Sequence, residues 1–127
     1  MAHEFHHGHI KSRDPRKTAR WWAETFGAKI LPESSIHGAL FAPVEISGVV
    51  INISTPIEKE RDKMSDGDAG LRYGFEHIGL LTDDLEADLA RIAEHGLEIF
   101  DVRDTAQAKI AFVETPDKVR VELIQRL

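Results

Sequence analysis

The chain contains an internal repeat, and this repeat constrains its fold more than any other feature. The segment HHGHIKSRDPRKTARWWAETFGAKIL at 6–31 aligns with EHIGLLTDDLEADLARIAEHGLEIF at 76–100, at an offset of 70 residues that becomes 69 after one extra residue in the first helical segment. The ends of the two halves, VVINIS at 49–54 and VRVELI at 119–124, superpose at the same offset. Solenoid repeats are only about 20 to 50 residues long. The longer period therefore indicates one supersecondary module that occurs twice.

Both halves have the same predicted order of elements. Each begins with a short apolar strand and continues with an amphipathic helix, for which Asp14-Pro15 and Asp84 supply the N-terminal caps. Gly27 and Gly96 follow the helices, where a left-handed cap favours glycine. The strands expected after the helices are 28–33, 38–45 and 48–54 in the first half, and 97–102, 108–114 and 118–124 in the second. The order is β-α-β-β-β, twice.

These elements predict an α+β fold in one domain over residues 1–127. Module one covers 1–55, a polar linker covers 56–74, and module two covers 75–127. The 42% apolar and 30% charged fractions are typical of a globular protein with its own hydrophobic core.

Composition also excludes several classes of function. A net charge of −6 and a pI near 5.6 argue against a nucleic-acid partner, which requires a clustered basic face. The absence of cysteine excludes thiol nucleophiles, cysteine-ligated zinc, iron–sulfur clusters and disulfides. No apolar run is long enough to span a membrane, and no signal-peptide pattern opens the chain. We therefore expect a cytoplasmic protein without a membrane partner.

Strand alternation predicts which polar side chains face away from the helices. Because Val121 and Leu123 belong on the helix-facing side, Glu122 belongs on the opposite, concave side of the sheet. The same alternation places His7 and His77 on equivalent faces. Polar groups there are costly unless they are paired, solvated or bound to a ligand. A shared metal ion would meet that requirement.

The sequence resembles the vicinal oxygen chelate superfamily over nearly its whole length. The pattern H-x₆-D opens each module, as His7 with Asp14 and as His77 with Asp84, and VEL closes the second module. The superfamily includes glyoxalase I, methylmalonyl-CoA epimerase, extradiol dioxygenases, and the bleomycin- and fosfomycin-resistance proteins. The resemblance implies that two βαβββ modules form a curved mixed sheet, the glyoxalase/bleomycin resistance/dioxygenase fold.

The resemblance also implies a set of metal ligands. Superfamily ligands come from the first and last strands of each module, which here gives His7, His77 and Glu122. The remaining position holds Asn52, a candidate fourth ligand or substrate contact. The implied cofactor is one divalent ion, and imidazole and carboxylate ligands suit iron, manganese, nickel, cobalt and zinc alike.

Three functions remain open. The preferred one is a glyoxalase-like isomerase, epimerase or lyase that acts on a small oxygenated substrate through a metal-stabilised enediolate or enolate, with Glu122 as the catalytic base. The second is an extradiol, ring-cleaving Fe(II) dioxygenase, although Phe112 stands where those enzymes place a tyrosine. The third is a metal-free binding protein of the resistance type that sequesters a small molecule.

Further residues are assigned to substrate and partner contacts. His9 and Lys11 share the predicted face of His7 and are expected, with Phe112, to contact the substrate. Trp22 fits the apolar stripe of the first helix, which leaves Trp21 exposed for an interface between modules or subunits. An exposed tryptophan of this kind favours a homodimer.

Overall fold

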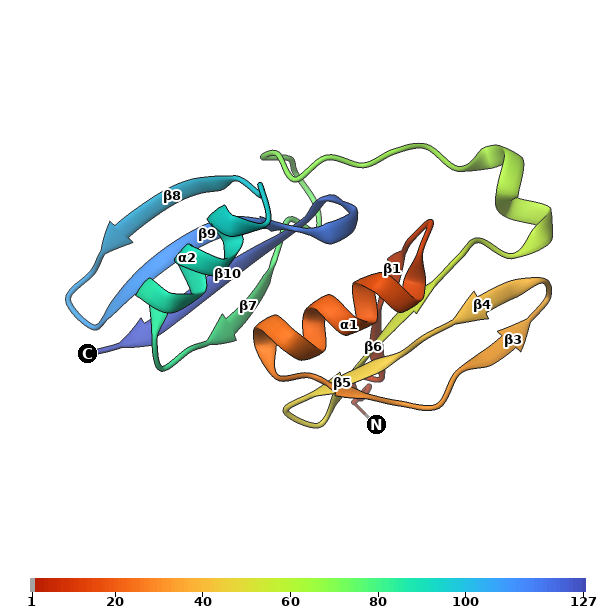
Figure 1. Cartoon of the computed structure of the whole chain (residues 1–127), viewed down its shortest axis with the longest axis horizontal. Helices are drawn as coiled ribbons and strands as arrows, with labels where there is room; N and C mark the ends of the chain where they lie inside the picture. The colour runs from red at the N-terminus through yellow and green to blue at the C-terminus, as the bar shows by residue number, and fades with distance from the viewer. Residues whose placement is uncertain (1) are drawn as a thin grey trace. The chain divides into compact units, whose positions relative to one another are not determined.

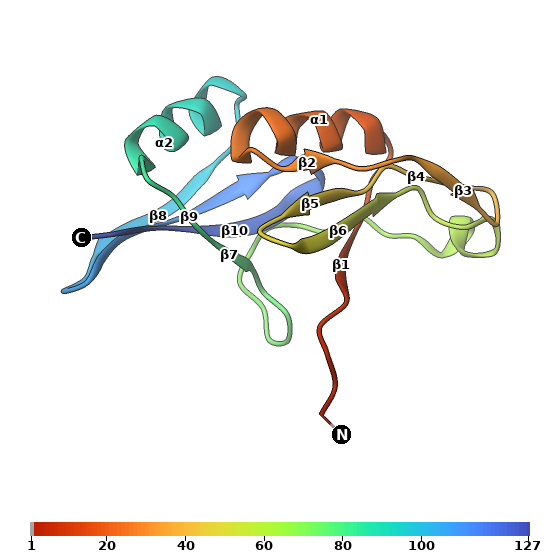
Figure 2. The same ribbon diagram turned by 90° about the horizontal axis from the view of Figure 1, so that it is seen from below.

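Each half of the chain builds one mixed sheet with one α-helix on it (Figure 1). The computed structural model describes residues 2–127, which divide into two compact units between Asp66 and Gly67. In each unit the helix lies along one face of its own sheet, as Figure 2 shows. The opposite face of each sheet is not covered by the helix of its own unit.

The first unit contains six strands. Its elements are β1 His7–Lys11, α1 Pro15–Phe26, β2 Lys29–Ile30, β3 Ser34–Ile36, β4 Ala39–Phe41, β5 Val44–Ile46, β6 Val49–Ser54 and a 3-10 helix at Glu58–Lys63. The strand order is β2-β5-β6-β4-β3, and β1 pairs with β6 in parallel.

The sequence predicted three strands after α1, at 28–33, 38–45 and 48–54, but the structure has five, β2 to β6. The segments 28–33 and 38–45 are therefore divided differently from the prediction. Strands β4 and β5 are separated by Ala42-Pro43, where proline lacks the N–H that a continuous ladder requires. Two tight turns, at His37-Gly38 and Ser47-Gly48, have positive φ at both residues and close the β3–β4 and β5–β6 hairpins.

The second unit follows the predicted order. Its elements are β7 Ile78–Leu81, α2 Leu85–Glu94, β8 Ile99–Asp104, β9 Ala108–Thr115, a 3-10 helix at Pro116–Lys118 and β10 Val119–Arg126. The strand order is β7-β10-β9-β8, with β7 parallel to β10 and the other pairs antiparallel. None of the helices in residues 2–127 is long and apolar enough to cross a membrane.

The parallel strand pairs have the same register in both units. His9 lies opposite Asn52 in β1 and β6, and Gly79 lies opposite Glu122 in β7 and β10. These two pairs differ by 70 residues at both positions, which is the offset of the sequence repeat. The duplicated module predicted from the sequence is therefore present in the strand pairing itself.

Both helices begin at the predicted acidic residues. The Asp14 carboxylate accepts a hydrogen bond from the backbone N–H of Lys17, and the Asp84 carboxylate accepts one from Ala87. These bonds satisfy backbone donors that have no partner within the helix.

The cores lie between helix and sheet. The largest fully buried side chains include Trp22 and Ile53 in the first unit and Ile92 and Leu123 in the second. The predicted exposure of Trp21 is wrong, because this side chain is only 8% exposed. The reason is that both tryptophan rings pack edge-on against Phe26, each with its centroid 5.1 Å from that ring. Trp21 therefore no longer supports a homodimer.

Replacing Gly27 by alanine is expected to lower the free energy of unfolding by about 1–2 kcal/mol, the cost of a left-handed conformation for a residue with a Cβ. Gly27 caps α1 with φ = 70°, and an added Cβ would meet no atom within 4 Å, so the destabilising effect comes from backbone strain rather than from a clash. Urea denaturation measures the change. As a control, Gly67→Ala has equal space and no positive φ, and its stability should stay unchanged or rise slightly. An equal loss in both variants would contradict the assignment.

Candidate metal centre

The second unit brings two of the predicted ligands together. His77 directly precedes β7, and Glu122 projects from β10 opposite Gly79. Gly79 has no side chain that could press on the Glu122 carboxylate. A Cβ added at this position would lie 3.8 Å from Oε1 of Glu122, an ordinary contact distance. The Nε2 atom of His77 lies 3.2 Å from Oε1 of Glu122. The side chain of His77 is 31% exposed and that of Glu122 is 18% exposed, so a small ligand can reach both.

The geometry of this pair suits a divalent cation. The other ring nitrogen of His77, Nδ1, lies 3.1 Å from Oε1 of Glu76. Nε2 and Oε1 of Glu122 can share a proton as a hydrogen bond, and both atoms offer a lone pair when a cation takes the place of that proton. Metal–ligand bonds of about 2.1 Å at angles near 90–110° separate nitrogen and oxygen by roughly 3.0–3.4 Å. The observed 3.2 Å falls in that range.

Aromatic rings and a buried arginine surround the pair. The ring of Phe112 lies edge-on to His77, with the centroids 5.2 Å apart. Arg120 is 7% exposed and packs against two rings, with its guanidinium carbon 4.6 Å from the centroid of Phe100 and 5.1 Å from that of Phe112. Its Nη1 donates to the carbonyl of Ala69 at 2.9 Å. These contacts leave the arginine little freedom to move.

The first unit places its predicted site residues along β1 and β6. His7 is exposed, and its Nδ1 lies 2.8 Å from Nδ1 of His6. Asn52 lies opposite His9 on β6. The predicted substrate contact Lys11 has its Nζ 3.8 Å from a carboxylate oxygen of Glu60, so an ion pair already engages it.

His9 is also engaged within its own unit. Its Nε2 and Oγ of Ser54, a fully buried side chain, share a hydrogen bond of 2.7 Å. Desolvation lowers the pKa of His9 below its ordinary value, and the positive charge of Lys11 lowers it further. The ring of Phe41 lies edge-on to His9, with the centroids 5.4 Å apart.

The described residues contain no complete set of metal ligands. Among residues 2–127 no group of three or more histidine, aspartate and glutamate side chains is gathered closely enough to hold an ion. The second unit unites His77, Glu122 and Phe112, whereas the first carries His7, His9, Lys11 and Asn52. Sequence reasoning gave no role to Glu76 or Arg120. Alternation does place Arg120 on the face of Glu122, but no sequence pattern marks Glu76.

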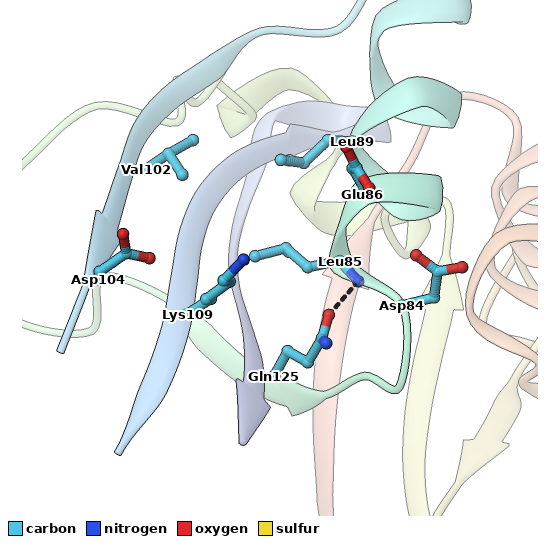
Figure 3. A pocket seen from close by; sticks show the side chains of 8 residues that line it. All are labelled: Asp84, Leu85, Glu86, Leu89, Val102, Asp104, Lys109 and Gln125. Atoms are coloured by element: carbon cyan, nitrogen blue, oxygen red, sulfur yellow. Dashed lines mark hydrogen bonds between the residues drawn. The ribbon is translucent and has the colours of Figure 1, made fainter. Parts of the chain in front are cut away.

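The second unit has a further hollow on the helix side of its sheet, of about 320 Å³ (Figure 3). It is lined by Asp84, Leu85, Glu86, Leu89, Val102, Asp104, Lys109 and Gln125. The Gln125 side chain spans part of it, where its Oε1 accepts a hydrogen bond of 2.7 Å from the backbone N–H of Leu85. None of the predicted site residues lines this hollow, and two of its polar side chains, Asp84 and Gln125, accept hydrogen bonds from backbone N–H groups at the start of α2.

Comparison with known families assigns the chain to a class. The model of the Glyoxalase/Bleomycin resistance protein/Dioxygenase superfamily matches residues 4–123. The chain belongs to this superfamily, which confirms the fold and the family resemblance predicted from the sequence. The comparison with curated proteins gives no match.

Solved structures share the fold at low sequence identity. A glyoxylase/bleomycin resistance protein/dioxygenase domain from Frankia sp. EAN1pec is 18% identical, with 100% of each chain covered and a TM-score of 0.75. TnmS3, an antibiotic binding protein from Streptomyces sp. CB03234, is 21% identical over 99% of this chain and 98% of its own, with a TM-score of 0.68.

A third structure contains a metal ion. It is a mutant of the fosfomycin resistance protein FosX from Listeria monocytogenes, complexed with Mn(II) and 1S,2S-dihydroxypropylphosphonic acid. It is 20% identical over 98% of this chain and 90% of its own, with a TM-score of 0.71. At these identities the likeness concerns the fold, and the superfamily contains both metal-dependent and antibiotic-binding members.

Proposed function

We propose that this protein is a divalent-metal-dependent enzyme of the glyoxalase type, an isomerase, epimerase or lyase acting on a small oxygenated substrate. The observation that carries the proposal is the approach of His77 Nε2 to Glu122 Oε1 at 3.2 Å. Both atoms are lone-pair donors of the kind that divalent cations prefer, and both side chains are accessible.

The proposed ligand set takes a third member from the first unit. His7 is the repeat equivalent of His77 and lies in β1, the counterpart of β7. It would come from the same chain or from a second copy in a homodimer. Asn52 is the equivalent of Glu122 and is proposed as a fourth ligand or a substrate contact. Two histidines and one carboxylate leave coordination positions open for a substrate.

The proposed chemistry divides the two oxygens of Glu122 between two tasks. A bound divalent cation supplies Lewis-acid polarisation of a substrate carbonyl. Oε1 of Glu122 faces His77, whereas Oε2 forms no hydrogen bond with any residue of 2–127. We assign Oε2 to accept the proton from the carbon next to the carbonyl. Phe112, which lies beside His77, would form one wall of the substrate site. His9 and Lys11 are the proposed substrate contacts from the first unit.

Two other functions have specific support. A ring-cleaving Fe(II) dioxygenase would use the same three ligands. However, Phe112 has no proton to donate, and Tyr73, the chain's only tyrosine, is fully exposed. A sequestering protein is favoured by the fold shared with TnmS3 and by the aromatic rings of Phe100 and Phe112. The metal content separates these functions.

Elemental analysis of the purified, tag-free protein is expected to find about one divalent metal ion per chain. The variants His7→Ala, His77→Ala and Glu122→Ala should each lose it while circular dichroism stays unchanged, because each removes a ligand. His95→Ala is the matched control, since that imidazole lies at the end of α2 with Nδ1 2.8 Å from the Arg91 carbonyl, and it should keep the metal.

The element found decides between the functions. Zinc, nickel, cobalt or manganese would support the isomerase or lyase, and iron would favour ring cleavage. A parent protein without metal, or variants that all retain it, would contradict the proposal in favour of the sequestering protein.

A further inference from the structure

We propose that β8 is a surface through which two copies of this chain associate, with their β8 strands paired antiparallel and Val102 of one copy opposite Val102 of the other. β8 lies at the end of the strand order β7-β10-β9-β8, and no strand of residues 2–127 pairs with its outer edge. Such an edge presents backbone N–H and C=O groups that a further strand can pair with. The proposal concerns another part of the second unit than the His77–Glu122 pair and does not depend on the proposed function.

The second half of β8 is regular and accessible. A register shift separates Ile99 from Asp101, but from Asp101 to Asp104 the strand pairs with successive residues of β9. These four residues include no proline, which would remove a backbone donor, and all four are exposed. A second strand can therefore pair here without a break in the ladder.

The side chains on one face of this segment carry opposite charges. Side chains two residues apart share a face of a strand, and Nε of Arg103 lies 2.9 Å from Oδ2 of Asp101. The guanidinium carbon of Arg103 lies over the ring of Phe112, 5.1 Å from its centroid. Charges on an edge strand usually discourage pairing. The segment Asp-Val-Arg differs because it is complementary in charge to an inverted copy of itself.

This charge pattern selects one register. In a pair of copies with two-fold symmetry, each contact between two different residues occurs twice. With Val102 on the symmetry axis, Asp101 lies opposite Arg103 of the second copy in both contacts. Moving the axis to residue 101 or to residue 103 would bring Asp101 or Arg103 against its own copy, and like charges directly opposite are destabilising.

The other face of the same register is apolar at its centre. Val102 points to the helix side of the sheet, where it lines the hollow in Figure 3 with Leu85 and Leu89, and it is 53% exposed. Pairing would place it against Val102 of the second copy, so that exposed apolar surface is buried beside the ion pairs. One short strand contributes an interface below about 1,200 Å², the size of weak complexes. We therefore expect a dimer that forms at high protein concentration.

The test is sedimentation velocity over protein concentrations that reach the millimolar range, with circular dichroism to check that each variant folds. The parent should show an equilibrium between monomer and dimer. Asp101→Arg and Arg103→Asp each bring like charges together in both contacts and should weaken the dimer at least about 10-fold. Asp104→Arg is the matched control, because it makes the same change of charge on the same strand but faces the uncharged Phe100 in this register. It should dimerise like the parent.

Two combinations of the same substitutions test the register itself. The double variant with Asp101→Arg and Arg103→Asp restores opposite charges in both contacts and should dimerise like the parent. An equal mixture of the two single variants should form a mixed dimer, because one copy then carries arginine at both positions and the other carries aspartate. The proposal would be overturned by a parent that stays monomeric, by single variants that dimerise like the parent, or by a double variant or mixture that stays monomeric.

Discussion

Replacing Glu122 by glutamine is expected to slow the exchange of hydrogens next to the carbonyl of a small 2-oxo acid by about 10²- to 10⁴-fold, the usual contribution of a general base. Glutamine has nearly the same shape, and its amide oxygen can still lie beside Nε2 of His77. It has no carboxylate oxygen to accept the proton that we assign to Oε2. The measurement is loss of the proton signal by NMR in deuterium oxide, across a panel of small 2-oxo acids.

The comparison requires variants loaded with equal amounts of metal, so that lost ligation is not mistaken for a lost base. Glu114→Gln is the matched control. Glu114 lies on β9 opposite Arg120, but its carboxylate bonds to Lys118 at 3.0 Å and to the Glu98 backbone N–H at 3.1 Å. Its exchange rate should remain near that of the parent. Equal rates in Glu122→Gln and the parent would remove Glu122 as the base, and equal losses in both variants would point to a change in the whole sheet.

The second large effect concerns the core of the first unit. Trp22→Ala is expected to lower the free energy of unfolding by about 3–5 kcal/mol, the range for deleting a large buried aromatic ring. Trp22 is fully buried and packs edge-on against Phe26, so its removal forfeits both the transfer of the ring from water and its packing contacts. Urea denaturation followed by circular dichroism measures the change.

Two further variants serve as controls for Trp22→Ala. Trp22→Phe retains an apolar ring and removes an indole N–H that has no hydrogen-bond partner within residues 2–127, so it should lose much less stability. Phe5→Ala removes a side chain that is 77% exposed and should change stability by less than about 0.5 kcal/mol. A loss below about 1 kcal/mol in Trp22→Ala would show that α1 is not the main cover of this sheet.

The sequence predicted most of the fold because the signals involved are local. The caps at Asp14 and Asp84 act within one helical turn, and strand alternation needs only neighbouring residues. The prediction was wrong where a local signal was ambiguous. The strand expected at 38–45 reads as one apolar run, but Pro43 divides it. Of the two adjacent tryptophans, only Trp22 was expected to face the core, whereas Trp21 is also buried and packs against Phe26.

By itself, the sequence determined the duplicated module, its register offset and the face of the sheet on which Glu122 lies, because each follows from a repeat or a period along the chain. Only the tertiary structure decided which side chains meet. His77 and Glu122 are 45 residues apart, and Arg120 reaches Glu76 only through the parallel pairing of β7 and β10. Such contacts depend on cross-strand packing and on rotamers fixed by surrounding rings, which no pattern of neighbouring residues specifies.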